Sequence, residues 1–174
     1  MLQPTFKLEY NKKDITKDIS KYVLSINYTD FEHGQSDEIE IVFEDSEKLW
    51  QSAWIPSKGD SLRLYIGYIG EKLLNCGLFE IDEVEFQTPP DTLKISQRVE
   101  NKQQALVKAK AALAKGNHTI EGSLNMMGNP YLIAGLNVEV KDVGYFSGKY
   151  HITQATHTLD RSSGYSLSLE VKSC

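Results

Sequence analysis

Two stretches of the chain carry carboxylates at strand-like spacing, and they consist of Glu38, Glu40 and Glu44, and of Asp82, Glu83 and Glu85. Two carboxylates that flank a cleft are what glycoside hydrolysis requires. Along a strand Glu38, Glu40 and Glu44 share one face, as do Glu83 and Glu85, and such a face forms either a solvated surface or the acidic wall of a channel. The sequence favours the solvated surface first, the channel wall second and catalysis last.

Four histidines are present, at positions 33, 118, 151 and 157. No pair has the HxxxH spacing of a helical metal site, and the two cysteines form no CxxC motif. His151 and His157 share strand parity, but six residues of strand separate them by roughly 20 Å, which is too far to share one ion. We therefore expect no metal ion and no cofactor.

Sequence motifs for nucleotide and acyl chemistry are missing, since the chain has no GxSxG, GxxxxGK[ST] or GxGxxG segment. Aromatic residues at strand parity, such as Tyr65, Tyr145 and Tyr150, are what a base-stacking barrel would use, but few lysines accompany them. We expect neither an enzyme nor specific nucleic-acid binding. A small cell-wall hydrolase and a nucleic-acid-binding barrel are kept as alternatives.

Alternating apolar and polar residues predict strands through most of the chain. The predicted strands cover residues 6–10, 23–30, 38–44, 62–68, 78–86, 92–95, 119–124, 136–140, 149–158 and 165–171. Asp45 and Ser46 are candidate N-caps for a short helix that carries Trp50 and Trp54 as a plug over a barrel end. Pro56 would end that helix.

The apolar period changes after residue 98, where a single helical face collects Ala105, Leu106, Ala109, Ala112 and Leu113. The predicted fold is mainly antiparallel β, with tube-type barrel halves and a central α-helix packed outside. Residues 1–97 form a first tube-like barrel in this interpretation. Residues 98–174 form the helix and a second barrel segment, which either stands alone or merges with the first.

The net charge of -5 conceals an asymmetry along the chain. Residues 1–97 hold 10 basic and 18 acidic residues, a net -8, whereas residues 98–174 hold 9 and 6, a net +3. Opposite charges at two parts of one molecule favour head-to-tail contact between copies. The chain has no apolar run long enough to span a bilayer and no secretory signal pattern, so we expect a soluble protein made in the cytoplasm.

Three ordered segments resemble the late control D family of phage tail hubs, which is related to the hub part of type VI secretion spikes. The longest begins at the Gly128-Asn129-Pro130 turn and reads GNPYLIAGLNVEVKDVGYFSGKYHITQATHTLDRSSGYSLSLEV. The segment GLFEIDEVEFQTPPDTLKI, which ends at Ile95, resembles the close of the family's first barrel. The segment RVENKQQALVKAKAAL, which begins at Arg98, resembles the helix of its last part.

The resemblance implies a structural baseplate hub of a contractile tail or injection system, assembled in the bacterial cytoplasm. Family hubs are trimers whose tube-like barrels form a pseudo-sixfold ring, and the implied partners are sister copies, the tail tube protein, the spike protein and other baseplate proteins. A hexamer, or a tube or tube-initiator protein built from hexameric rings, is the alternative. The candidate lumen or ring contacts are Glu38, Glu40, Glu83 and Glu85.

The sequence departs from the family at one place. Family members carry further domains between the segments that end at Ile95 and begin at Arg98, whereas only two residues separate them here. A naturally minimal hub and an engineered deletion both fit this junction. Functions that the family assigns to its middle domains are therefore not carried over.

Overall fold

The computed structural model describes residues 2–32, 34–88, 90–98 and 120–174. Its elements are β1 (Pro4–Tyr10), β2 (Lys13–Asp14), α1 (Thr16–Ile19), β3 (Val23–Phe31), β4 (Glu38–Glu44), β5 (Ser61–Tyr68), β6 (Leu74–Gln87), β7 (Thr92–Arg98), β8 (Glu121–Met127), β9 (Asn137–Val140), the 3-10 turn η1 (Gly144–Phe146), β10 (Gly148–Asp160) and β11 (Gly164–Ser173). The predicted mainly antiparallel β fold is confirmed, because the described strands pair antiparallel throughout.

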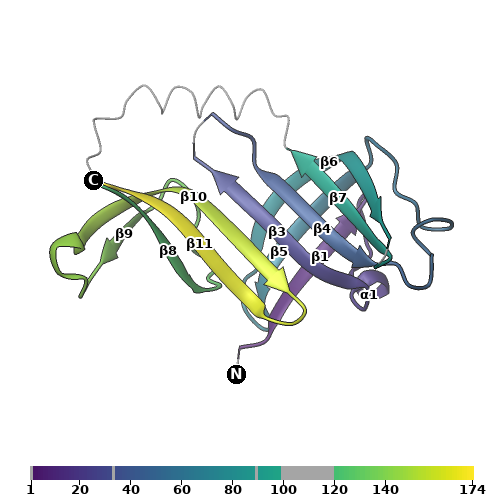
Figure 1. Ribbon diagram of the computed structural model, residues 1–174, viewed down its shortest axis with the longest axis horizontal. Coiled ribbons are helices and arrows are strands. Elements are labelled where there is room, and N and C mark those ends of the chain that lie inside the picture. Colours follow the sequence, from purple (N-terminus) through teal and green to yellow (C-terminus); the bar gives the residue numbers. More distant parts are fainter. Residues whose placement is uncertain (1, 33, 89, 99–119) are drawn as a thin grey trace.

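The strands form one continuous sheet in the order β2-β1-β5-β6-β7-β4-β3-β10-β11-β8, and β9 pairs with β10 off this path. Strand β10 joins the two parts of the chain by pairing with β3. Figure 1 shows the sheet curling, so that β3 and β4 cross in front of β5 and β1. This curl lets a single sheet enclose apolar side chains without a second layer.

The described residues form two clusters of buried side chains. The first lies within the curl of β1, β3, β4, β5, β6 and β7, and its fully buried members include Ile41, Phe43 and Phe79. The second gathers inward residues of β10 and β11, among them Ile152 and Leu169. The inward face of an alternating strand supplies each cluster, as the sequence pattern predicts.

A close contact joins the two parts of the sheet at the ends of β5, β8 and β11. The Tyr68 hydroxyl donates a hydrogen bond of 2.8 Å to the Gly128 carbonyl, and the Tyr68 and Tyr165 rings lie 5.4 Å apart. A Cβ atom on Gly128 would lie 2.1 Å from Cγ of Tyr165. Only glycine fits at this joint, because any side chain would occupy the volume of the tyrosine ring.

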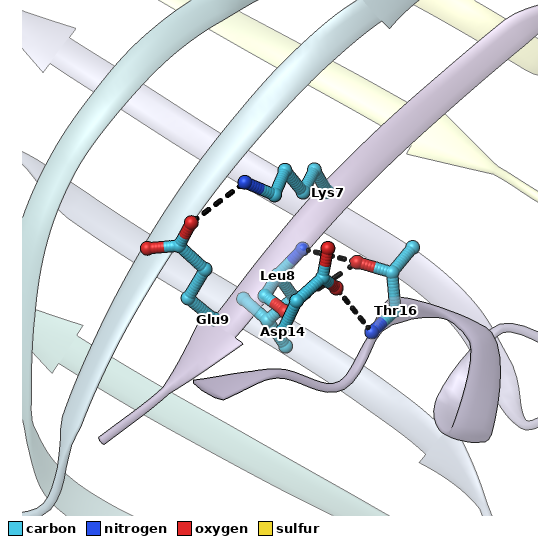
Figure 2. Close-up of polar contacts among 5 residues, drawn as sticks. All are labelled: Lys7, Leu8, Glu9, Asp14 and Thr16. Atoms are coloured by element: carbon cyan, nitrogen blue, oxygen red, sulfur yellow. Dashed lines mark hydrogen bonds and ion pairs between the residues drawn. The ribbon is translucent and has the colours of Figure 1, made fainter. Parts of the chain in front are cut away.

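The first hairpin turns through Asn11 and Lys12, whose φ angles of 46° and 69° match a two-residue turn that follows the strand twist. A one-turn helix, α1, then docks against β1 (Figure 2). The Thr16 hydroxyl accepts the Leu8 backbone N–H at 2.9 Å, and the Asp14 carboxylate accepts the Thr16 N–H at 2.9 Å. Residues 11–19 therefore close one end of the first core.

The predicted helix over residues 45–54 is wrong, since this segment forms a series of turns. Asp45 does not cap a first helical turn. Its buried carboxylate accepts hydrogen bonds from the backbone N–H of Trp50 at 3.0 Å and from the side-chain amide of Gln51 at 2.9 Å. Lys48 has a left-handed φ of 55°, which an α-helix excludes. The loop nevertheless buries Trp50 against Phe43 in the first core.

The region that departs from the family pattern lies within a regular element. Ser96 and Gln97 belong to β7, which pairs with β4 on one side and with β6 on the other. The chain thus passes Ile95 in the middle of the sheet, not at a sheet edge. The helix predicted after residue 98, as well as His33 and His118, lies outside the described residues.

Candidate functional site

The four candidate carboxylates lie on the outward face of neighbouring strands. In β4 the side chains of Ile39 and Ile41 are buried in the first core, so Glu38 and Glu40 point to the opposite face. Strand β7 lies between β4 and β6, and its Ser96 is opposite Glu40 on one side and Glu83 on the other. The sheet therefore brings together residues more than forty positions apart in the sequence.

A β-bulge puts Glu83 on this face. Ile81 points into the core, and regular alternation would send residue 83 inward as well. The pairing of β6 with β7 shifts register between Ile81 and Glu83, which adds one residue and reverses the parity beyond it. Val84 packs against the core as a result, while Glu83 and Glu85 face outward.

The carboxylates border a shallow cleft. Its volume is about 520 Å³, and its lining includes Asn27, Glu38, Glu40, Asp82 and Glu83. Glu85 is not part of the lining; it lies beside the cleft, opposite Lys94 of β7. Three of the four predicted residues thus share one hollow, and the fourth flanks it.

Lys94 is a cation within this acidic group. Its Nζ lies 2.8 Å from a Glu40 carboxylate oxygen. The hydrogen bond with Glu40 and the nearby charges of Glu85 and Glu83 raise the pKa of Lys94. The lysine therefore remains charged, and the carboxylates around it outnumber it.

The outward face continues without a break across the next strands. Thr29 of β3 is opposite Thr156 of β10, with their hydroxyls 3.5 Å apart, and Thr156 is in turn opposite Ser168 of β11. We call the polar part of this outward surface the polar face; it is made by Glu83 and Glu85 of β6, Lys94 and Ser96 of β7, Glu38 and Glu40 of β4, Ser25, Asn27 and Thr29 of β3, Gln154, Thr156 and Thr158 of β10, and Ser166, Ser168 and Glu170 of β11. Val42 of β4 is an apolar residue on the same surface, opposite Ser25 and Lys94. It is acidic over β4 and β6 and mostly uncharged over β3, β10 and β11.

Both described histidines contact neighbouring polar side chains of the sheet. His151 lies with Nε2 2.5 Å from a Glu32 carboxylate oxygen and Nδ1 2.7 Å from the Asn137 side-chain oxygen. His157 is fully buried, and its Nδ1 lies 2.7 Å from the Tyr165 hydroxyl. Burial lowers the pKa of His157 to about 4, so its ring is neutral near pH 7. Among the described residues no group of three or more His, Cys, Asp or Glu is arranged to hold a metal ion.

The neutral part of the polar face was missed by sequence reasoning, which singled out only carboxylates. Its signal was present in the alternation Gln154, Thr156, Thr158 and Ser166, Ser168. Hydroxyl and amide side chains carry no charge pattern, so only strand pairing reveals that they continue the acidic surface.

Among the described residues, no helix has the length and apolarity needed to cross a membrane.

Comparison with known proteins identifies relatives in phage tails. The chain is 35% identical over 97 residues to a probable baseplate hub protein of Escherichia phage 186 and 33% identical over 97 residues to that of Escherichia phage P2. Each match covers 56% of this chain and 24% of the relative, so the chain spans about a quarter of the length of these relatives. No family model matches the chain.

Two solved structures share the fold. A tail protein from Neisseria meningitidis MC58 superposes with a TM-score of 0.65 at 8% identity, covering 98% of this chain and 96% of that one. The 43 kDa tail protein of prophage MuSo2 from Shewanella oneidensis gives a TM-score of 0.56 at 9% identity, covering 97% and 98%. The resemblance to phage tail hubs is thus confirmed, while the late control D subfamily stays a prediction.

Proposed function

We propose that this chain, which is similar to the baseplate hub proteins of two phages, is itself a structural hub subunit of a phage-type tail. The sequence similarity to those two hubs carries the proposal, and the shared fold of two tail proteins supports it. In this role the protein catalyses no reaction. It acts in the virion tail by holding strands in a ring that joins the tail tube to the spike.

The state of the sheet edges supports the proposed ring. Strand β8 pairs with β11 alone among the described strands, and β2 covers β1 at Glu9 and Tyr10 only. Open strand edges invite pairing with another chain, and closed symmetry removes them. We propose that sister copies satisfy these edges in a trimer or hexamer, with residues 1–97 and 98–174 acting as the two tube-like units.

The polar face lines the lumen of that ring in this proposal. A channel that passes DNA or a tape-measure protein needs walls without apolar patches, and the hydroxyl and amide side chains of β3, β10 and β11 meet that need. Glu38, Glu40, Glu83 and Glu85 add negative charge, which repels nucleic-acid phosphates and lets them pass without binding.

Native mass spectrometry over a range of protein concentrations tests the proposal. We expect trimers or hexamers that increase with concentration. A strict monomer at every concentration would count against a ring-forming hub, and open-ended filaments would favour a tail tube protein instead. A zymogram on cell-wall glycan is expected to show no clearing, and clearing would reopen the hydrolase alternative.

A further inference from the structure

Two strands, β6 and β8, border the polar face. Strand β8 follows β11, and its Ser123 and Asn125 are opposite polar-face residues of β11, whereas Leu124 between them packs against the second core. On the other side the polar face ends on β6, with Glu83 and Glu85. The outward side of the sheet therefore stays polar as far as β8, and the edges of β6 and β8 are its margins.

One edge of β8 is open among the described strands, since β8 pairs with β11 alone. Hydrogen bonds of 2.8 Å join β11 to the Ile120 carbonyl at one end of β8 and to the Gly128 N–H just past the other. In an antiparallel pair the main-chain groups of every second residue bond the neighbouring strand. Those of Ser123 and Asn125 therefore point away from β11, toward the open edge.

Strand β6 extends beyond the strand beside it, which leaves a second open edge. The pairing with β5 ends at Glu80, and the main-chain bonds that follow join Ile81 to Gly59 and Asp60, each at 2.9 Å. Residues 82–87 continue β6, and among the described strands they have β7 on one side and no strand on the other. We call residues 82–87 the open half of β6.

Both open edges expose an apolar side chain on the core side of the sheet. Phe86 of β6 is opposite the buried Leu93, and Met126 of β8 is opposite the buried Leu167, so each shares a face with a core residue. Phe86 is nevertheless 44% exposed and Met126 is 38% exposed. Contact between the two would remove apolar surface from water on both sides, and a thioether packs favourably against an aromatic ring.

The directions of the two strands are compatible with a ring. Every step along the path β6-β7-β4-β3-β10-β11-β8 is antiparallel, so β8 runs in the same direction as β6. A rotation that generates the next copy keeps this direction, so β8 of one copy meets β6 of the next as a parallel neighbour. The edge of β1 lies beyond β5, behind β3 and β4 in Figure 1, and is not a margin of the polar face.

We propose that β8 of one copy pairs in parallel with the open half of β6 of the next copy, with Met126 beside Phe86. The contact is heterologous, because each copy uses a different edge on its two sides, and repeated by rotation it closes the sheet. It joins the polar faces of neighbouring copies into one wall. The inference rests on the proposed ring and specifies the contact that closes it.

The chemistry of the outward side chains favours this pairing over the alternative with two equal edges. The same register places Ser123 beside Glu83 and Asn125 beside Glu85, so hydroxyl and amide donors meet carboxylate acceptors. Pairing β6 with β6 of another copy would bring carboxylates together, which is unfavourable between neighbouring strands. Three copies would give roughly 21 strands to the wall, more than the 16–18 strands of porins, which enclose a water-filled channel.

Crosslinking of the full chain tests the contact. The paired variant carries Asn125→Cys and Glu85→Cys, and the control carries Asn125→Cys and Arg63→Cys, the latter on the exposed side of β5. Cys174→Ser removes the exposed native thiol from both, and Cys76 is buried. With a short bis-maleimide reagent, we expect covalent dimers and larger multimers to be at least tenfold more abundant for the paired variant.

Native mass spectrometry of an edge variant gives an independent measurement. Asn125→Pro removes a main-chain N–H that points to the open edge, a position at which an edge strand tolerates proline. Asn125→Ala keeps this N–H and is the matched control. We expect at least a tenfold loss of oligomer for Asn125→Pro and a much smaller loss for Asn125→Ala, with cooperative urea unfolding retained in both.

The outcomes separate this contact from the ring itself. Oligomers in which the paired variant crosslinks no more than the control would overturn the pairing of β8 with β6 and leave the hub proposal in place. Full assembly of the Asn125→Pro variant would also overturn the pairing alone. An unchanged protein that stays monomeric at every concentration would overturn both.

Discussion

Protonation of His157 should destabilise this protein at mildly acidic pH. The ring is fully buried, stacked on Tyr28 at 5.9 Å, and its Nδ1 lies 2.7 Å from the Tyr165 hydroxyl. Burial holds the pKa of His157 at about 4 in the folded protein, against 6.5 for the unperturbed side chain. Between these values the unfolded chain binds a proton that the folded chain does not, so folding becomes less favourable as the pH falls.

The size of this effect follows from the two pKa values. Lowering the pH from 7 to 5 should reduce the free energy of unfolding by about 2 kcal/mol, and the loss should approach about 3 kcal/mol near pH 4. Above about pH 8 the imidazole is neutral in both states and contributes no pH dependence. The carboxylates with lowered pKa, such as Asp160 at about 2, affect stability only at more acidic pH.

Urea unfolding at pH 7, 6 and 5 measures this contribution, at a concentration where the protein is monomeric. His157→Gln removes the titrating ring, so the unchanged protein should lose about 2 kcal/mol more than the variant between pH 7 and 5. Other histidines titrate in both proteins and cancel in the difference. Tyr165→Phe is the control, since it deletes the hydroxyl contact but keeps the buried ring and hence the pH dependence. Parallel curves for the His157→Gln variant and the unchanged protein would refute the reasoning.

Three further substitutions test how the sheet is held together, each by denaturant unfolding. Gly128→Ala should destabilise the fold by about 3 kcal/mol or more, because the new methyl would overlap the Tyr165 ring, whereas Gly122→Ala meets no atom within 4 Å and should change little. Tyr68→Phe should cost about 1 kcal/mol, because the buried Gly128 carbonyl loses its donor. Thr16→Val should cost about 1 kcal/mol by removing the acceptor of the Leu8 N–H, and no loss would mean that α1 is not docked by this bond.

Strand alternation made much of the sheet predictable. The bounds of β4 agree with the predicted residues 38–44, and most other strands differ by one to four residues at an end. A buried face on every second residue is a strong local signal, because one residue of slip would reverse it. The same signal placed Glu38 and Glu40 opposite the core.

Features that depend on tertiary contact were not predictable. The bulge that turns Glu83 outward is defined by the pairing of β6 with β7, and local sequence does not mark it. Aspartate is a favoured N-cap residue, yet the Asp45 carboxylate accepts the backbone N–H of Trp50 instead. This hydrogen bond holds residues 45–50 in a loop where a helix was predicted. The burial of His157 depends on Tyr28, which comes from a distant part of the chain, as well as on Tyr165 of the next strand.

The direction of the polar face in the assembled protein tests the central claim most directly, and an electron cryo-microscopy reconstruction of the oligomer measures it. We predict a ring in which Glu38, Thr29, Thr156 and Ser168 face the central channel. A reconstruction in which these side chains lie on the outer wall, or are buried between copies, would contradict the account.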